Sequence, residues 1–459
     1  MIKKLFGDRY FYRRVVLLML PILIQNGITQ FVNMLDNLMV GQVGQAQMTG
    51  VSVANQLIFV FNLCIFGAVS GAGIFGAQFV GKGDHKGLRD TFRFRIIVAG
   101  LITVIASCAF IFFGEELVGL YLKGEGTPDE IALSLSTGYT YLKIMVIGLL
   151  PAALVQCFAS TLRETGQTVP PMAAGIVAVV VNLVLNYALI FGHFGFKSYG
   201  AAGAAIATVI SRFVELIAVG GWTVIRRDRN PFIVGAFRSL RVPASLVGSI
   251  LVKGLPLMAN EAMWATGIAF VNQSYSSRGL DVVAATNIMQ TFFNVFSVAF
   301  MAVGAAIGII LGQLLGAGKT EEARSSSVKL ITFSILVSIG VGGLFALCAE
   351  FIPEMYNVSD EVKLLSTRLM QICALMKPLD AFTHASYFTL RSGGEAFVTI
   401  IFDSGFVWAV SVPAALILCR MTALPILYVY AICQGLNVLK CLIGGIFVKR
   451  GRWIKRIVS

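Results

Sequence analysis

Apolar and polar positions follow one another along this chain in long blocks. Mainly apolar stretches recur from residue 15 to residue 447, and short polar gaps separate them. Many are longer than the roughly 20 residues that cross the hydrocarbon core of a bilayer as one α-helix. The pattern predicts an all-α integral membrane protein with about twelve transmembrane helices. The expected helices are 15–40, 52–80, 96–120, 139–161, 171–192, 201–225, 246–272, 285–315, 330–349, 365–389, 397–418 and 423–447.

Composition supports the same class of protein. Of 459 residues, 57% are hydrophobic and 13% are charged, and the mean hydropathy is +0.82. A soluble chain of this length cannot hide so much apolar surface in one or two cores. We therefore expect a multi-pass protein of the cell membrane, in contact with the lipid bilayer, and not an enzyme.

The net charge is +13, and the positions of the basic residues along the chain indicate which helix ends face the cytoplasm. Twenty-six of the 36 lysines and arginines gather at alternate gaps, whereas the intervening gaps hold only Lys123, Lys197, Arg278, Lys363 and Arg420. Cytoplasmic loops of membrane proteins are enriched in Lys and Arg. Both termini are therefore predicted to be cytoplasmic, and no nucleic-acid partner is expected. The basic side comprises Lys3, Lys4, Arg9, Arg13, Arg14, Lys82, Lys86, Arg89, Arg93, Arg95, Arg163, Arg226, Arg227, Arg229, Arg238, Arg241, Lys253, Lys319, Arg324, Lys329, Arg391, Lys449, Arg450, Arg452, Lys455 and Arg456.

The chain contains an internal repeat. Residues 76–83 read GAQFVGKG and residues 311–318 read LGQLLGAG, with an offset of 235 at the glutamine and at both later glycines. Each half has six expected helices and begins on the same side, so the repeat is parallel, with a pseudo-two-fold axis along the membrane normal. Such duplications place a substrate cavity between the halves. Further matching pairs are Pro21 with Pro256, Tyr121 with Tyr356 and, at an offset of 228, 161–163 with 389–391.

The longest non-apolar stretch lies near the middle of the chain and contains Pro231 and Pro243. We interpret it as the link between the two halves. The predicted organisation is an N-terminal six-helix lobe at 1–225, a cytoplasmic linker at 226–245, a C-terminal six-helix lobe at 246–448 and a basic cytoplasmic tail at 449–459.

Ionisable residues inside the expected helices are candidate functional residues, because a charge in a bilayer is costly unless it faces a cavity or a partner. Asp380 lies eleven residues before Arg391, which is about 16 Å along a helix. Lys377 and His384 share its helix face, so an ion pair is the alternative to a functional role. Glu261 has no basic residue within one helical turn along the sequence, and it is a second candidate for proton binding.

The first half offers a third candidate site. Asp36 lies towards the outer end of helix 15–40, and Asn182 and Asn186 share one face of helix 171–192 in its outer half. A carboxylate and two amide oxygens at matching depth suit a proton or a hydrated Na⁺. Pro21 and Pro256 each remove a backbone hydrogen bond within a helix and are candidate bending points.

Taken in order, these residues resemble the multidrug and toxic compound extrusion (MATE) family over nearly the whole chain. The resemblance implies two pseudo-symmetric six-helix lobes in a V shape. It also implies export of cationic drugs in exchange for H⁺ or Na⁺. The residues that carry it are Pro21, 36–41, 76–83, Leu162, Arg163, 182–192, 200–208 and Ser211 in the first half, and 313–318, Asp380, Ala381, Leu390 and Arg391 in the second.

The resemblance also assigns roles to single residues. Asp36 matches the acidic residue on the first helix of the family, and Asn182 and Asn186 match its asparagine or aspartate pair on the fifth helix. One branch has an aspartate at the position of Asn186, so Asp36 is the one candidate carboxylate of this pocket. Asp380 matches an acid on the tenth helix of another branch, whereas Glu261 lies about one turn from that branch's acid on the seventh helix.

We therefore expect a secondary active multidrug antiporter that works as a monomer. Its candidate substrate cavity contains Asp36, Asp380, Glu261 and His384, and it needs no cofactor beyond the coupling ion. The alternative is a flippase for lipids or lipid-linked saccharides, which would favour a basic cavity. A major-facilitator transporter does not fit the loop from Gly81 to Arg89, and a receptor or channel would not depend on a gradient.

One apparent nucleotide-binding motif is incomplete. Gly318, Lys319 and Thr320 resemble the end of a phosphate-binding P-loop, but Gln313 stands where that motif needs a glycine. No ATP is therefore expected to energise transport.

Overall fold

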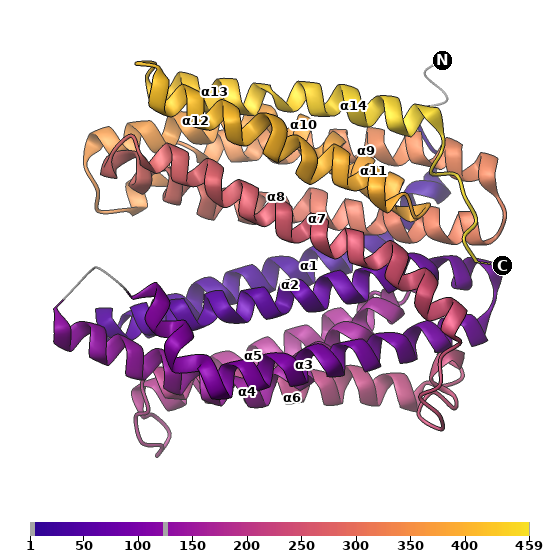
Figure 1. Cartoon of the computed structure of the whole chain (residues 1–459), viewed down its shortest axis with the longest axis horizontal. Helices are drawn as coiled ribbons and strands as arrows, with labels where there is room; N and C mark the ends of the chain where they lie inside the picture. Colours follow the sequence, from indigo (N-terminus) through magenta and orange to yellow (C-terminus); the bar gives the residue numbers. More distant parts are fainter. Residues whose placement is uncertain (1–4, 123–126, 459) are drawn as a thin grey trace. The chain divides into compact units, whose positions relative to one another are not determined.

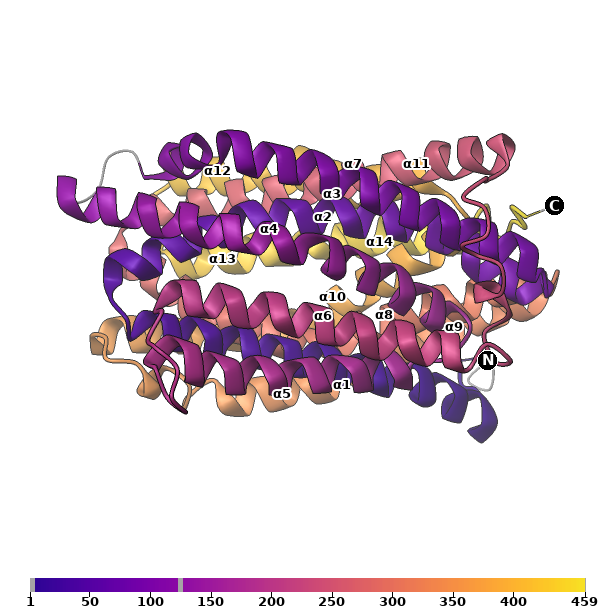
Figure 2. The same cartoon turned by 90° about the horizontal axis from the view of Figure 1, so that it is seen from below.

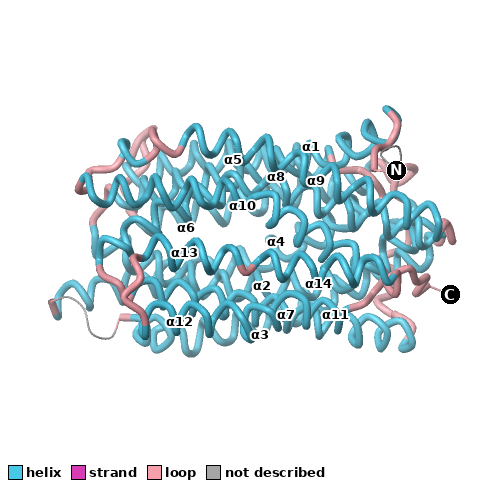
Figure 3. Tube along the Cα trace, turned by 90° about the horizontal axis from the view of Figure 1, so that it is seen from above, coloured by secondary structure: helices cyan, strands magenta, loops and turns pink. Residues whose placement is uncertain are grey.

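The computed structural model describes residues 5–122 and 127–458, except for the side chains of residues 33, 34, 37, 38 and 45. Lys3, Lys4 and Lys123 of the charge analysis lie outside the described residues. The described chain consists of helices and loops without a β-strand (Figure 3). This confirms the predicted all-α fold.

Twelve long helical runs make up the described chain: α1 to α10, Ala396–Met421 and Ile426–Arg450 (Figure 1). The last two are assembled from shorter pieces, including two π-helical segments. The helices are α1 (Arg9–Gly41), α2 (Gln45–Lys82), α3 (His85–Tyr121), α4 (Pro128–Glu164), α5 (Val169–Phe191), α6 (Ala201–Ile225), α7 (Ala244–Ser276), α8 (Leu280–Gly316), α9 (Thr320–Cys348), α10 (Asp360–Ser392), α11 (Ala396–Ile400), α12 (Val412–Met421), α13 (Ile426–Gly435) and α14 (Asn437–Arg450).

Several helices begin earlier than the apolar pattern predicts, because their polar first turns are capped. Helix α3 begins at His85, where the Asp84 carboxylate accepts a hydrogen bond from the backbone N–H of Gly87 at 2.8 Å. Helix α4 begins at Pro128, after a capping box formed by Thr127 and Glu130. Side chains of this kind satisfy the free N–H groups of a first helical turn, so the helices extend beyond their apolar middles.

Ten helices of the described chain are long and apolar enough to cross a membrane by length and composition alone. The two long helices outside that set are α7 and α10. They carry Glu261 and, in the middle of α10, Lys377, Asp380 and His384. Such polar positions lower the hydropathy of a helix, and a membrane protein tolerates them where other helices enclose them.

Contacts divide the chain into two compact units. Unit 1 comprises Met1–Leu23, Ala77–Gly83 and Val252–Ser459, and unit 2 comprises Ile24–Gly76 and Asp84–Leu251. The first part of α1 and the last part of α2 therefore group with the C-terminal helices. The units differ in this respect from the contiguous lobes 1–225 and 246–448, which stay a prediction from the sequence.

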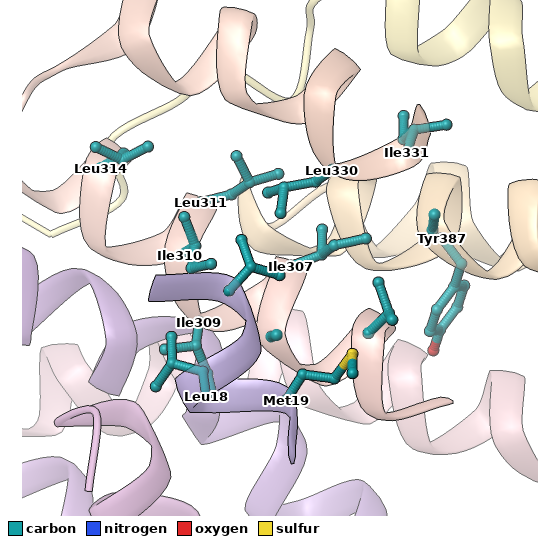
Figure 4. Close-up of a cluster of buried hydrophobic side chains, with 14 of the residues drawn as sticks. Leu18, Met19, Ile307, Ile309, Ile310, Leu311, Leu314, Leu330, Ile331 and Tyr387 are labelled. Carbon is teal, nitrogen blue, oxygen red and sulfur yellow. The ribbon is translucent and has the colours of Figure 1, made fainter. Parts of the chain in front are cut away.

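The core of unit 1 lies where α10 packs against α8 and α9. Figure 4 shows Leu18 and Met19 of α1 beside Ile307 and Ile310 of α8, with Leu330 of α9 close by. These side chains are buried, and burial of apolar surface against neighbouring helices holds the start of α1 in this unit.

In unit 2, α6 packs along both α4 and α5, and α3 packs along α4 (Figure 2). The predicted linker 226–245 is folded onto this unit. The Arg93 guanidinium of α3 donates hydrogen bonds to the carbonyl oxygens of Gly235 at 2.7 Å and Ala236 at 2.9 Å. The ring of Phe232 lies 5.3 Å from that of Phe92. The segment is therefore a packed part of unit 2.

The repeat motif forms a reciprocal helix crossing inside unit 1. A Cβ atom added to Gly81 of α2 would overlap the carbonyl oxygen of Gln313, and a Cβ added to Gly316 of α8 would overlap the carbonyl oxygen of Gln78. Only glycine permits so close an approach of two helix backbones. The matching glycines and glutamines of the two halves therefore mark one physical contact.

The C-terminal segment is anchored through Gln78. Its side-chain amide donates to the carbonyl oxygens of Ser392 and Lys455, both at 3.1 Å, and its Oε1 accepts from the Ile457 N–H at 2.8 Å. Trp453 is fully buried. The residues predicted as a basic tail therefore pack onto the helices of unit 1.

Many of the basic residues assigned to gaps lie within the ends of helices instead, and three of these arginines are buried or hydrogen-bonded there. Arg95 of α3 is 1% exposed and pairs with Glu164 of α4. Arg163 donates a hydrogen bond to Gln25, and Arg391 is buried near the end of α10. Their assignment to gaps between helices was wrong, because α3, α4 and α10 extend past them.

Candidate cation-coupling site

The structure brings Asp36, Asn182 and Asn186 together in unit 2. The Asn186 side-chain amide donates to Asp36 Oδ1 at 2.6 Å and to Asn182 Oδ1 at 3.1 Å. Asp36 lies five residues before the end of α1, and Asn186 lies five residues before the end of α5. The matching depths explain why the carboxylate and the amide meet.

The hydrogen-bond network continues into α6. The Asn182 amide donates to Thr208 Oγ1 at 3.4 Å. Asn186 is 0% exposed, and its Oδ1 atom is buried without a hydrogen-bond partner among the described residues. An unpaired buried acceptor is uncommon and needs a physical explanation. The site therefore offers a carboxylate, amide oxygens and a hydroxyl, which are the hard ligands that H⁺ or Na⁺ prefers.

Two charged residues of α6 lie near this site, and the sequence analysis missed both. Arg212 Nη1 and Glu215 Oε2 are 3.0 Å apart, and their side chains are 41% and 7% exposed. The Arg212 guanidinium also lies within electrostatic range of Asp36. Both residues fall inside the expected helix 201–225, so a search for every ionisable residue within the helices would have found them.

Glu261 of unit 1 has partners that the sequence did not predict. The Tyr387 hydroxyl donates to Glu261 Oε1 at 2.8 Å, and Arg391 Nη1 lies 3.9 Å from the same oxygen. The sequence offers Glu261 no basic residue within one helical turn, and α10 supplies the arginine from a distant part of the chain.

A second ion pair lies in unit 1, and the sequence analysis also missed it. Lys440 Nζ of α14 is 2.7 Å from Asp403 Oδ1, and the Asn260 amide donates to Asp403 Oδ2 at 3.0 Å. Asp403 belongs to a π-helical segment, Ile401–Gly405, within the run Ala396–Met421. Both charged residues lie inside expected helices, so their positions within apolar segments already marked them as candidate functional residues.

Asp380 has a different partner from the expected one. The Asn437 amide lies 3.5 Å from Asp380 Oδ1. Lys377 Nζ donates to Ser297 Oγ at 2.6 Å and lies 3.5 Å from the centre of the Phe293 ring. Among the ion pairs of the described residues, none joins Lys377 to Asp380, so the alternative of a local ion pair was wrong.

Asp380 and Glu261 have different contact residues in unit 1. Glu261 contacts Tyr387 and Arg391, which follow Asp380 by seven and eleven residues on α10. Seven residues correspond to about 10 Å along a helix. His384 lies between these levels, where its ring centre is 5.3 Å from that of Phe300 and its buried Nδ1 has no partner within the described chain.

The two predicted bending points lie within continuous helices. Helix α1 runs through Pro21, and α7 runs through Pro256. The assignment to the two units changes close to each proline, after Leu23 in α1 and after Leu251 in α7. Bending at these positions stays a prediction.

Twelve long helical runs, several of which carry acidic side chains among polar partners, are typical of a multi-pass membrane protein. A family model described as MatE matches residues 21–188 and 256–417, and the chain therefore belongs to the MATE family of transporters. The two matched segments begin at Pro21 and Pro256, with the same offset of 235 residues that relates the internal repeat.

Curated relatives agree with the family. The chain is 25% identical over 451 residues to "Probable multidrug resistance protein NorM" of Thermotoga maritima, which covers 97% of this chain and 94% of the relative. It is 25% identical over 408 residues to "Multidrug resistance protein PmpM" of Pseudomonas aeruginosa, with coverage of 87% and 82%.

Solved structures show the same fold. A MOP superfamily transporter from Pyrococcus furiosus matches with a TM-score of 0.85 at 18% identity, covering 99% of this chain and 98% of that one. An outward-facing multidrug resistance MATE family transporter matches with a TM-score of 0.86 at 17% identity and covers 98% of each chain.

Proposed function

We propose that the protein is a secondary active antiporter that exports organic, mostly cationic compounds in exchange for H⁺ or Na⁺. The names of its relatives support multidrug efflux as the physiological activity. The proposed energy source is the ion gradient alone, with no further cofactor and no ATP. We propose that the monomer is sufficient, and that the basic helix ends and both termini face the cytoplasm.

The observation that carries this proposal is the arrangement around Asp36. Its carboxylate accepts a hydrogen bond from a neutral amide, and no basic group among the described residues lies within ion-pairing distance of it. A cation that binds there does not have to displace the charged group of a lysine or arginine side chain. Rotation of the Asn186 amide by half a turn would present its unpaired Oδ1 to that cation.

Competition between the coupling ion and the organic cation for the Asp36 carboxylate would couple ion entry to export of the organic cation. In a state open to the outside, H⁺ or Na⁺ neutralises Asp36, and an organic cation loses its counter-charge and leaves. In a state open to the cytoplasm, the coupling ion leaves and the organic cation binds. Because each ligand binds best to one state, the ion gradient shifts the populations and drives export.

Reconstituted transport tests the proposal. Purified protein is placed in liposomes that contain ethidium, and a pH gradient or a Na⁺ gradient is imposed in turn on wild type, Asp36→Asn, Asp380→Asn and the double variant. We expect one gradient to drive ethidium efflux from wild type and Asp36→Asn to abolish it. Gradient-driven efflux in all three variants would contradict the coupling site, and absence of efflux from folded wild type would favour a lipid substrate.

A further inference from the structure

Helix α6 presents a polar stripe within its membrane-spanning length. Thr208, Arg212 and Glu215 follow one another at spacings of four and three residues, so they share one face of the helix. Arg212 is the twelfth residue of the 25-residue helix and lies close to its middle. A charged residue at this depth is expensive and rare, and it marks a functional site by default.

Glu215 is the fixed member of the pair. Its side chain is 7% exposed, and it lies between two cations, with Arg212 at 3.0 Å and Arg163 of α4 within electrostatic range. Arg163 is held by a hydrogen bond of 2.6 Å to Gln25 of α1. Gly175 of α5 leaves room for this cluster, since a Cβ there would lie 3.2 Å from Gln25 Nε2 and 3.6 Å from Glu215 Oε1.

Arg212, by contrast, has a partly exposed side chain. Its side chain is 41% exposed, which is unusual for a charged group in the middle of a membrane-spanning helix. If Arg212 moves away, Glu215 keeps Arg163 as a cationic neighbour. Movement of Arg212 therefore avoids the large cost of leaving a buried charge without a partner.

Arg212 lies one helical turn after Thr208, which is linked through Asn182 and Asn186 to Asp36. Its charge acts on the Asp36 carboxylate and on Tyr141 of α4, and Tyr141 is hydrogen-bonded to Asn55 of α2. The other described groups at Asp36 are the neutral amides of Asn186 and Asn182. Arg212 thus shares the helix face of Thr208 and Glu215 and lies one turn from the hydrogen-bond network of Asp36.

We propose that Arg212 is a built-in counter-cation for Asp36 and that Glu215 holds it back. This inference rests on the proposed function, because it assumes that cations bind at Asp36. When no external cation is bound, the Arg212 guanidinium turns towards Asp36 and neutralises it. When an organic cation arrives, Arg212 returns to Glu215. Arg212 is therefore a positioning residue that sets how strongly external cations compete for the carboxylate.

Equilibrium binding of ethidium to the purified full-length protein in lipid nanodiscs, at fixed pH and without a gradient, tests this inference. Arg212→Gln should bind ethidium about five- to tenfold more tightly, because a competing positive charge is removed. Glu215→Gln should bind it more weakly by a similar factor, because Arg212 is released towards Asp36. Arg212→Lys should stay close to wild type, and Arg226→Gln, at the exposed end of α6, is the matched control.

The double variant Arg212→Gln/Glu215→Gln shows whether Glu215 acts through Arg212. It should bind ethidium as Arg212→Gln does, because no guanidinium remains to be released. A merely structural pair would weaken binding in both single variants, and that result would overturn the inference. Shifts of unchanged size in an Asp36→Asn background would overturn it too. Failure of the proposed function is a separate result, namely no gradient-driven efflux by wild type.

Discussion

Asp36 in unit 2 and Asp403 in unit 1 are acidic residues within membrane-spanning helices, but their neighbours differ. Asp36 is hydrogen-bonded to the neutral amide of Asn186, whereas Asp403 is paired with Lys440 at 2.7 Å and also accepts a hydrogen bond from Asn260. Glu261, a second acid of unit 1, has Arg391 at 3.9 Å, whereas Asp380 contacts the neutral amide of Asn437. Asp403 and Glu261 are therefore each balanced by a basic side chain of the same unit.

This difference indicates where an external cation can act. A cation that approaches Asp403 or Glu261 must displace a lysine or an arginine that the fold holds in place. At Asp36 it meets neutral amides and, on our inference, one arginine that another carboxylate holds back. The two halves descend from one repeat, but their acidic sites have diverged in chemistry.

The largest expected effect concerns transport itself. Asp36→Asn should reduce gradient-driven ethidium efflux to the level of protein-free liposomes, because the carboxylate that binds the cation is gone. Glu261→Gln is the matched change in unit 1 and should keep most of the efflux. The opposite pattern, with Glu261→Gln inactive and Asp36→Asn active, would reverse the comparison.

The next largest effect concerns the stability of unit 1. Lys440→Met leaves the half-buried Asp403 without its cation and should lower the free energy of unfolding by about 3–5 kcal/mol. Thermal unfolding of the purified protein measures this loss. Lys455→Met breaks a pair with Glu395 whose lysine is 55% exposed, and it should cost less than about 1 kcal/mol. Equal losses in the two variants would refute the structural role given to Lys440.

A smaller effect is expected from the amide at Asp36. Asn186→Ala removes a hydrogen bond to a charged group, which contributes about 1.5–3 kcal/mol. The half-maximal concentration of a coupling H⁺ for ethidium efflux should therefore fall by about tenfold or more, because the ionised carboxylate loses a donor that stabilises it. Asn437→Ala, which removes the 3.5 Å contact to Asp380, is the control in unit 1 and should leave that concentration nearly unchanged.

The smallest expected effect concerns stability at the matching glycines of the two halves. Gly81→Ala and Gly316→Ala each place a methyl group against the opposing helix backbone, and each should destabilise the protein by about 1–3 kcal/mol. Gly221→Ala, with nothing within 4 Å of the added Cβ, is the control for thermal unfolding. Similar losses at Gly81 and Gly316 would support the reciprocal crossing, and a loss at only one would contradict it.

Sequence reasoning came closest where local pattern and depth carry the information. The apolar blocks predicted the helices, and the offset of 235 residues related Gly81 to Gly316 before their contact was seen. Asp36, Asn182 and Asn186 were grouped correctly because the position of a residue along a spanning helix gives its depth, and the spacing of the asparagines gives their common face.

Residue patterns alone predicted the membrane class, the helices, the repeat and the grouping around Asp36. Which cation meets which carboxylate became known only from the packing of the helices. Arg391 reaches Glu261 from α10, and Lys440 reaches Asp403 from α14, although neither pair is close in the sequence. The periodicity of a helix gives the face on which a side chain lies, but its partner depends on which other helix packs against that face. That choice is made by packing of whole helices, which no local pattern encodes.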